Sequence, residues 1–169
     1  TRESIYWLLL SLKKYYNVCL IGTNGTYLSI KHLETHFNSK NTTPKLSYII
    51  NIIKKYSKIN ILILEVSSEA IYYNRLGNLE FDIICLTNIG HDHVNTHLDY
   101  DNYIDSKSSL FKRFKTSGLK YSIINNDERF KDRFIDNLEK DIKLLKLALK
   151  IQYDLTRNES IKKELDELK

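Results

Sequence analysis

Short runs of apolar residues alternate with longer amphipathic segments over the first 126 residues. The apolar runs are rich in Ile, Leu and Val, which is typical of strands that are buried on both faces. They cover residues 18–21, 61–66, 83–87 and 121–125. Helical spacing of apolar residues marks the segments 3–15, 46–56 and 101–114. This alternation predicts an α/β fold with a mainly parallel sheet and flanking helices.

The pattern changes at Asp127. Apolar residues then recur every three or four positions, which predicts one long amphipathic helix and no further strand. These residues are Phe134, Leu138, Ile142, Leu145 and Leu149. A second helix is expected over residues 159–168. We therefore divide the chain into an α/β part, residues 1–126, and a helical tail, residues 127–169.

The composition is that of an ordinary globular domain. The 169 residues are 42% hydrophobic and 28% charged, which excludes disordered and collagen-like chains. The net charge of +5 lies wholly in residues 1–126, because 11 basic and 11 acidic residues cancel in the tail. The lysines are scattered, so we expect no nucleic-acid partner. No apolar run approaches the ~20 residues that span a bilayer, so we expect a cytoplasmic protein without membrane contact.

The chain has two cysteines, Cys19 and Cys85, and each lies inside an apolar run. A disulfide framework requires more cysteines in a shorter secreted chain. We therefore expect two buried free thiols in a reducing compartment.

A polar segment with a carboxylate follows the second apolar run. Glu65, Ser67 and Ser68 stand where that strand ends, and ligands of open α/β sheets bind at such ends. A carboxylate there can hold Mg²⁺, and the hydroxyls can bind phosphate or carboxylate oxygens. The alternative is structural: the serines cap the next helix and Glu69 lies in its first turn.

Three of the five histidines lie in the segment after the third apolar run, together with Asn88. His93 and His97 have the spacing of a zinc pair on one helix face, but no cysteine or other third ligand is evident. The alternative is a polar loop with one functional histidine. Lys107, on the next predicted helix, is by itself typical of a solvated helix face.

Two loop segments carry hydroxyl and glycine residues. Gly22-Thr23-Asn24-Gly25-Thr26 follows the first strand, but a phosphate loop needs a lysine after its last glycine. A turn after the strand is the better interpretation. Asn41-Thr42-Thr43-Pro44 is typical of a helix start with proline at the first helical position.

Taken together, these segments resemble the central ATPase domain of the Mur ligase family. The resemblance rests on four motifs in the family's order and spacing, and it covers roughly residues 1–127. The motifs are Asn41-Thr42-Thr43, Glu65-Val66-Ser67-Ser68, Thr87-Asn88 with Asp92-His93 and His97, and Tyr103 with Lys107-Ser108-Ser109-Leu110-Phe111. Within the family, the chain is most similar to the members that add the third amino acid of the peptidoglycan stem peptide.

The resemblance implies a role for particular residues. Glu65 and His93 match the positions that hold the Mg²⁺ bridging ATP and substrate. Lys107 matches a carbamylated lysine, an anion that can bind metal. The positions that match contacts to the UDP-muramoyl substrate are Asn41, Thr42, Thr43, Ser67 and Arg75. Asn88 matches a position near the nucleotide.

The implied reaction joins UDP-N-acetylmuramoyl-dipeptide and an amino acid with ATP as co-substrate. The γ-phosphate activates a substrate carboxylate as an acyl phosphate, and the amine then attacks it. In the family, the C-terminal domain selects lysine or diaminopimelate. Two alternatives remain open: another ligase of the superfamily, of the folylpolyglutamate or cyanophycin type, and a non-catalytic α/β module that binds a nucleotide or a partner protein.

The sequence departs from the family pattern in several places. Its residues include no phosphate loop and no strand ahead of the first helix, and Glu69 and Asn95 replace a usual histidine and aspartate. The tail does not match the strands that complete the family's central sheet. We expect a fragment or degenerate copy of the ligase whose 169 residues alone do not turn over ATP.

Overall fold

The computed structural model describes residues 2–30, 33–37, 41–90, 100–118 and 120–147. The described residues form two compact units that divide between Ala70 and Ile71. Each unit has its own sheet and core.

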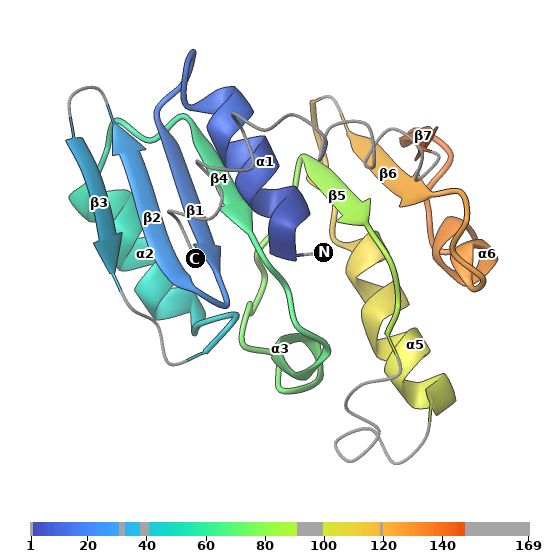
Figure 1. The fold of residues 1–169 in the computed structure, drawn as a ribbon. Helices are drawn as coiled ribbons and strands as arrows, with labels where there is room; N and C mark the ends of the chain where they lie inside the picture. Colours follow the sequence, from blue (N-terminus) through green and yellow to red (C-terminus); the bar gives the residue numbers. More distant parts are fainter. Residues whose placement is uncertain (1, 31–32, 38–40, 91–99, 119, 148–169) are drawn as a thin grey trace. The chain divides into compact units, whose positions relative to one another are not determined.

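The first unit is built on a four-stranded sheet with the order β3-β2-β1-β4 (Figure 1). Its strands are β1 (Val18–Gly22), β2 (Gly25–Ile30), β3 (Leu33–Phe37) and β4 (Ile61–Leu64). β1 runs parallel to β4 and antiparallel to β2, and β2 is antiparallel to β3. The helices α1 (Arg2–Leu12) and α2 (Leu46–Lys55) lie on opposite faces of this sheet (Figure 1).

A two-residue turn joins β1 to β2. Gly22 pairs with Gly25, so Thr23 and Asn24 form the turn. Gly25 has a φ of 113°, and a Cβ at this position would lie 2.2 Å from the Phe37 carbonyl oxygen. The predicted turn is therefore confirmed, whereas the antiparallel hairpin strands after it were not predicted.

The core of the first unit lies between α1 and the sheet. Four residues of α1 pack against side chains of β1 and β4. They are Tyr6, Trp7, Leu9 and Leu10, which contact Val18, Leu20 and Ile63. Every residue of β1 is buried, as its unbroken apolar run predicts.

The second unit is built on a parallel sheet with the order β5-β6-β7. Its strands are β5 (Ile83–Leu86), β6 (Tyr121–Asn125) and β7 (Lys143–Leu147). The helical segments are α3 (Ser68–Tyr72), which crosses the division between the units, α5 (Tyr100–Ser109), the 3₁₀ turn Leu110–Lys112 and α6 (Lys131–Ile135). Buried residues of α5 and α6, such as Ile104 and Phe134, form one core with Ile84 and Ile124 of the sheet.

The prediction of a long helix after Asp127 is wrong. The described residues there form the short α6 and then β7, which pairs with β6 in parallel over five residue pairs. The apolar spacing fits a helix as well as a strand, and the edge of β6 supplies backbone partners that a helix cannot use. The second predicted helix, over 159–168, lies outside the described residues.

Two smaller expectations also change. Cys85 is a free thiol, as predicted, but it is exposed, because β5 buries only Ile84 and Leu86 on one face. The helix after Pro44 begins at Leu46 with Lys45 as its N-cap, so Pro44 is not its first residue. No helix among the described residues is long and apolar enough to cross a membrane.

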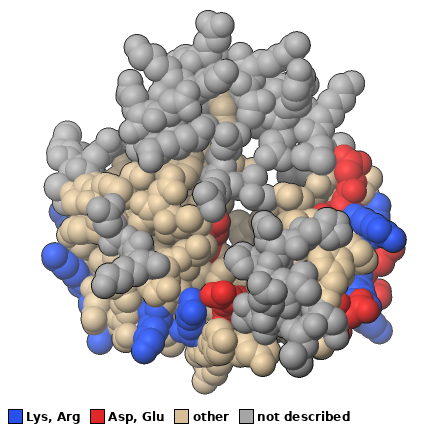
Figure 2. All heavy atoms as spheres, turned by 60° about the horizontal axis from the view of Figure 1, so that its bottom comes forward, with Lys and Arg blue, Asp and Glu red and all other residues tan. Residues whose placement is uncertain are grey.

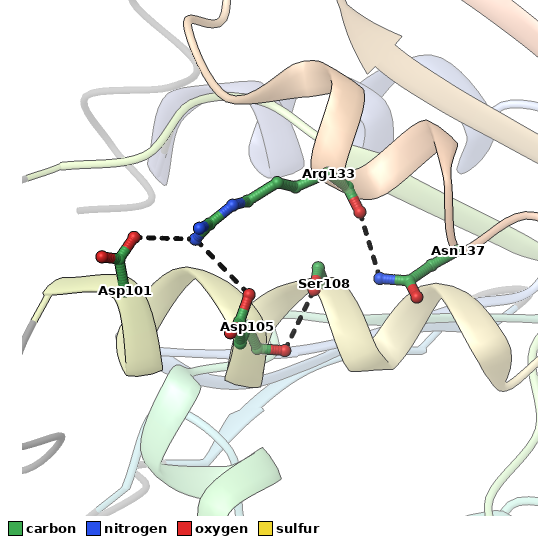
Figure 3. Close-up of polar contacts among 5 residues, drawn as sticks. All are labelled: Asp101, Asp105, Ser108, Arg133 and Asn137. Atoms are coloured by element: carbon green, nitrogen blue, oxygen red, sulfur yellow. Dashed lines mark hydrogen bonds and ion pairs between the residues drawn. The ribbon is translucent and has the colours of Figure 1, made fainter.

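An ion-pair cluster connects α5 to α6 (Figure 3). The Arg133 guanidinium lies 2.9 Å from the carboxylate of Asp101 and 3.4 Å from that of Asp105. The Arg133 carbonyl also accepts a hydrogen bond from the Asn137 amide. Figure 2 shows Lys and Arg side chains at separate places on a face that also carries Asp and Glu.

Candidate functional site

The polar residues after β1 and β4 meet at one edge of the first sheet. The two strands are parallel neighbours, so their carboxyl ends lie side by side. Thr23 follows β1 and Glu65 follows β4, and the Glu65 backbone N–H donates to the Ile21 carbonyl at 2.8 Å. Ligands bind at this kind of edge in open α/β sheets.

Thr23 holds the Glu65 carboxylate with two hydrogen bonds. Its backbone N–H donates to Oε2 at 2.7 Å and its hydroxyl donates to the same oxygen at 2.9 Å. Gly22 provides the space, because a Cβ on this residue would lie 2.8 Å from Oε2. Among the described residues, Oε1 of Glu65 accepts no hydrogen bond and Glu65 forms no ion pair.

Thr42 supports this contact from the neighbouring loop. Its hydroxyl lies 3.1 Å from the Thr23 hydroxyl. A hydroxyl has one hydrogen to donate, and that of Thr23 is directed to Glu65. The Thr42 hydroxyl is therefore the donor to Thr23, and the two threonines form a chain that ends on the carboxylate.

Thr43 connects its loop to the end of β4. Its side chain is fully buried, and its hydroxyl donates to the Glu65 carbonyl at 2.8 Å. The Thr43 hydroxyl oxygen in turn accepts the Ser67 backbone N–H at 2.9 Å. The Thr43 hydroxyl thus donates one hydrogen bond and accepts another within the protein. The two bonds fix the backbone on either side of Val66.

Ser67 caps α3. Its side-chain oxygen accepts the Ala70 backbone N–H at 3.2 Å, the contact expected of an N-cap residue. Glu69 lies in the first turn of the helix. The structural interpretation is therefore confirmed for Ser67 and Glu69, whereas Ser68 is the first residue of α3. This arrangement is compatible with a ligand role for Glu65, which precedes the cap.

A buried phenol from α1 lies within electrostatic range of Glu65. Burial raises the pKa of Tyr6 above its usual value, and a hydrogen bond to Tyr27 raises it further. The negative charge of Glu65 makes a smaller contribution in the same direction. Tyr6 therefore stays a neutral phenol at physiological pH.

Three further predicted residues belong to the second unit. Lys107 lies in the last turn of α5, with its Nζ 5.0 Å from the centre of the Tyr103 ring. Arg75 follows α3, and its guanidinium lies 5.7 Å from the centre of the Tyr73 ring. Asn88 follows β5 and is exposed.

Glu128 is a polar residue of the second unit that none of the sequence motifs contains. It is only 9% exposed, its Oε2 accepts the Ile89 backbone N–H at 2.8 Å and its Oε1 accepts that of Phe130 at 3.3 Å. It therefore joins the loop after β6 to the loop after β5, which begins at Thr87. The acidic pair Asp127-Glu128, separated by one residue from the end of an apolar run, is the signal in the sequence that points to it.

The structure thus brings together Thr42, Thr43, Glu65 and Ser67 within the first unit. Asn41 is exposed on the same loop as Thr42. His93 lies outside the described residues, as does the proposed zinc pair. Among the residues that the structure describes, no group of three His, Cys, Asp or Glu side chains could hold a metal ion.

A family model for the Mur ligase middle domain matches residues 1–169. A solved structure of a UDP-N-acetylmuramoyl-L-alanyl-D-glutamate–2,6-diaminopimelate ligase has a TM-score of 0.67 at 22% identity. The match covers 87% of this chain and 29% of that one. At this identity the likeness shows the fold, a mixed α/β arrangement with flanking helices.

Several relatives are named as ligases that act on UDP-N-acetylmuramoyl-L-alanyl-D-glutamate. The ligase of that name from Helicobacter pylori is 37% identical over 76% of this chain and 27% of its own length. Ligase 1 of that name from Clostridium acetobutylicum is 32% identical over 88% of this chain and 28% of its own length. A UDP-N-acetylmuramoyl-L-alanyl-D-glutamate–L-lysine ligase from Staphylococcus epidermidis is 33% identical over 69% of this chain and 24% of its own length. The chain therefore spans about a quarter of the length of these relatives.

Proposed function

Because the chain belongs to the Mur ligase family, whose middle-domain model it matches, we propose that it forms part of an ATP-dependent ligase of peptidoglycan synthesis. The ligase adds the third amino acid to UDP-N-acetylmuramoyl-dipeptide in the cytoplasm. The observation that carries the proposal is the family match over residues 1–169, combined with a carboxylate fixed at the carboxyl end of β4. The relatives' names contribute the substrate class.

The reaction proceeds in two steps. An oxygen of the substrate carboxylate attacks the γ-phosphorus of ATP, and ADP leaves with the electron pair of the broken P–O bond. The amine of the third amino acid then attacks the acyl carbon, an amide forms, and inorganic phosphate leaves. The protein contributes mainly orientation and charge stabilisation to both steps.

The residues present fit Mg²⁺ in one respect. Mg²⁺ in phosphoryl-transfer sites takes one or two carboxylates, several waters and substrate phosphates, and Oε1 of Glu65 accepts no hydrogen bond from the described part of the chain. Bound there, Mg²⁺ would neutralise charge on the transferred phosphoryl group. Glu65 and His93 are the proposed protein ligands.

The other predicted site residues of the first unit bind or position the substrate. Asn41 and Thr42 lie on the accessible side of their loop, where they can contact the UDP-muramoyl substrate. Thr43 and Ser67 act on that substrate through the backbone they hold, because the Thr43 hydroxyl is already used on both sides.

In the second unit we propose three ligand contacts. Arg75 pairs with an anionic group of the substrate, and Asn88 lies beside the nucleotide. The Lys107 ammonium loses one proton to give the amine, and the amine nitrogen then bonds to the carbon of CO₂ and releases a second proton, so that a cation becomes a carbamate anion. A ¹³C signal from labelled bicarbonate that is present in wild type and absent in Lys107→Arg would support this modification.

The function is tested by product formation in the intact protein. The reaction contains UDP-N-acetylmuramoyl-L-alanyl-D-glutamate, MgATP and either lysine or diaminopimelate, and mass spectrometry detects the amide. We expect the product in wild type, and a loss of at least about 100-fold in Glu65→Gln, because a charged ligand is removed. Glu80→Gln is the matched control, since Glu80 is exposed outside the first unit. Absence of the product with both amino acids would refute the proposal.

A further inference from the structure

The β1–β2 turn is shaped around the Glu65 carboxylate. Two donors of one residue, the Thr23 N–H and hydroxyl, converge on the same oxygen at 2.7 and 2.9 Å. Hydrogen bonds to a charged acceptor are about twice as strong as neutral ones. Such a pair fixes both the position of the carboxylate and which of its oxygens faces the protein.

A second observation points to the same geometry. Gly22 leaves the space that Oε2 occupies, because a Cβ there would lie 2.8 Å from Oε2 and 3.3 Å from the Glu65 Cβ. A side chain at position 22 would push the carboxylate away from Thr23. The turn therefore accommodates the carboxylate by shape and binds it by hydrogen bonds.

The direction of the hydroxyl hydrogens extends the argument to Thr42. Thr23 donates to Glu65, so Thr42 donates to Thr23 across 3.1 Å. The Thr42 oxygen then has no hydrogen left for an outside ligand and presents only lone pairs. Oε1 of Glu65 is likewise an acceptor without a donor among the described residues. The Thr42 hydroxyl and Oε1 of Glu65 therefore offer an outside ligand two acceptor oxygens and no hydrogen-bond donor.

We propose that Thr23 is a positioning residue that fixes Glu65 through Oε2 and thereby presents Oε1 to a divalent cation, with Thr42 supporting Thr23. This inference rests on the proposed metal role of Glu65. It assigns a new role to the β1–β2 turn, which contains no phosphate-loop lysine. Carboxylates that ligate metals are usually held by such hydrogen bonds, and losing one typically lowers metal affinity by about 10-fold to 100-fold.

The test measures binding of Mn²⁺ alone to the intact protein, from the loss of the free Mn²⁺ signal in electron paramagnetic resonance. We expect Thr23→Val to raise the dissociation constant about 10-fold, and Thr23→Ser to restore it, because serine keeps the hydroxyl. Thr42→Val should have a smaller effect in the same direction. Thr26→Val is the matched control: Thr26 lies in the same hairpin, but its hydroxyl contacts Tyr48 at 3.0 Å.

The outcomes separate this inference from the proposed function. If wild type does not bind Mn²⁺, or Glu65→Gln binds it as tightly as wild type, the metal role of Glu65 fails and the inference fails with it. If Glu65→Gln binds weakly but Thr23→Val binds like wild type, only the role of Thr23 is refuted. An equal loss in Thr23→Val and Thr26→Val would also refute it, because the effect would then be a general one on the hairpin. If Thr23→Val does not fold, Thr42→Val compared with Thr42→Ser decides the same question.

Discussion

The Thr43 hydroxyl oxygen accepts the backbone N–H of Ser67 at 2.9 Å and connects two segments that are 24 residues apart. The same hydroxyl donates to the Glu65 carbonyl. One buried side chain thus fixes the backbone that carries the proposed metal ligand and the cap of α3.

Thr43→Val should lower the free energy of unfolding by about 1–3 kcal/mol, because the Glu65 carbonyl and the Ser67 N–H, both at half-buried residues, lose their partner. Urea unfolding measures the change. Thr43→Ser keeps the hydroxyl and should lose less, although it removes a buried methyl group. Thr116→Val is the control, since Thr116 is exposed, and an equal loss in that variant would contradict the assignment.

Glu128→Gln should loosen the start of the segment that follows β5. Both carboxylate oxygens accept backbone N–H groups, from Ile89 and Phe130, whereas glutamine has only one oxygen and would turn its NH₂ group toward a donor. We expect faster hydrogen exchange of the Ile89 amide and a loss of about 1–2 kcal/mol in stability. Glu139→Gln, at an exposed position, should change neither quantity. Unchanged protection of Ile89 in Glu128→Gln would show that this contact does not hold the loop.

The ion pairs of Arg133 should contribute little to stability. Asp101 and Asp105 are largely exposed, with 75% and 66% of their side chains accessible, so water and salt screen the attraction. Arg133→Gln should change the free energy of unfolding by less than about 1 kcal/mol, and the difference should shrink in high salt. Thermal unfolding at two salt concentrations checks this, and a larger effect that does not depend on salt would contradict it.

Cys19 should make stability fall at alkaline pH. Burial raises the pKa of the Cys19 thiol from 9.0 to about 12, so the unfolded chain releases this proton at lower pH than the folded protein does. The folded state then binds more protons between these values, and its stability decreases as pH rises above about 9. We expect Cys19 to contribute a loss of about 1 kcal/mol between pH 8 and pH 10.

The comparison of wild type with Cys19→Ala isolates this contribution, because all other titrating groups are shared. Urea unfolding at pH 8 and pH 10 should show a steeper decrease for wild type. Identical slopes would mean that the thiol titrates normally in the folded protein. A thiol reagent at pH 8 should also leave Cys19 unmodified until the protein unfolds.

The sequence predicts the buried parallel strands well, because β1 and β6 are short runs that consist largely of apolar residues. Such runs are typical of strands that are covered on both faces. The apolar pattern does not predict the hairpin strand β2, because Thr26 and Ser29 interrupt it, although Thr26 is buried beside Tyr48. For β7 the sequence predicts a helix, because Ile142 and Leu145 continue a helical spacing from Phe134. Only pairing with β6, a contact distant in sequence, decides between these structures.

The candidate site, like the fold, can be predicted only in part from the sequence. The motifs of the family resemblance identify Glu65, Thr42 and Thr43, and the apolar run before Glu65 predicts that this residue lies at the carboxyl end of a strand. The role of Thr23 depends on where its hydroxyl points, and the burial of Thr43 depends on the loop that covers it. Such details require the three-dimensional arrangement, because the sequence shows only that these residues are polar.

The most direct test of the proposed reaction follows the oxygen of the substrate carboxylate. UDP-N-acetylmuramoyl-dipeptide labelled with ¹⁸O in that carboxylate is incubated with the intact protein, MgATP and the third amino acid, and the released phosphate is analysed by mass spectrometry. An acyl phosphate transfers one labelled oxygen to the phosphate, so we predict phosphate with a single ¹⁸O atom and an equal amount of amide. Amide formation with unlabelled phosphate, or release of phosphate without amide, would contradict the account.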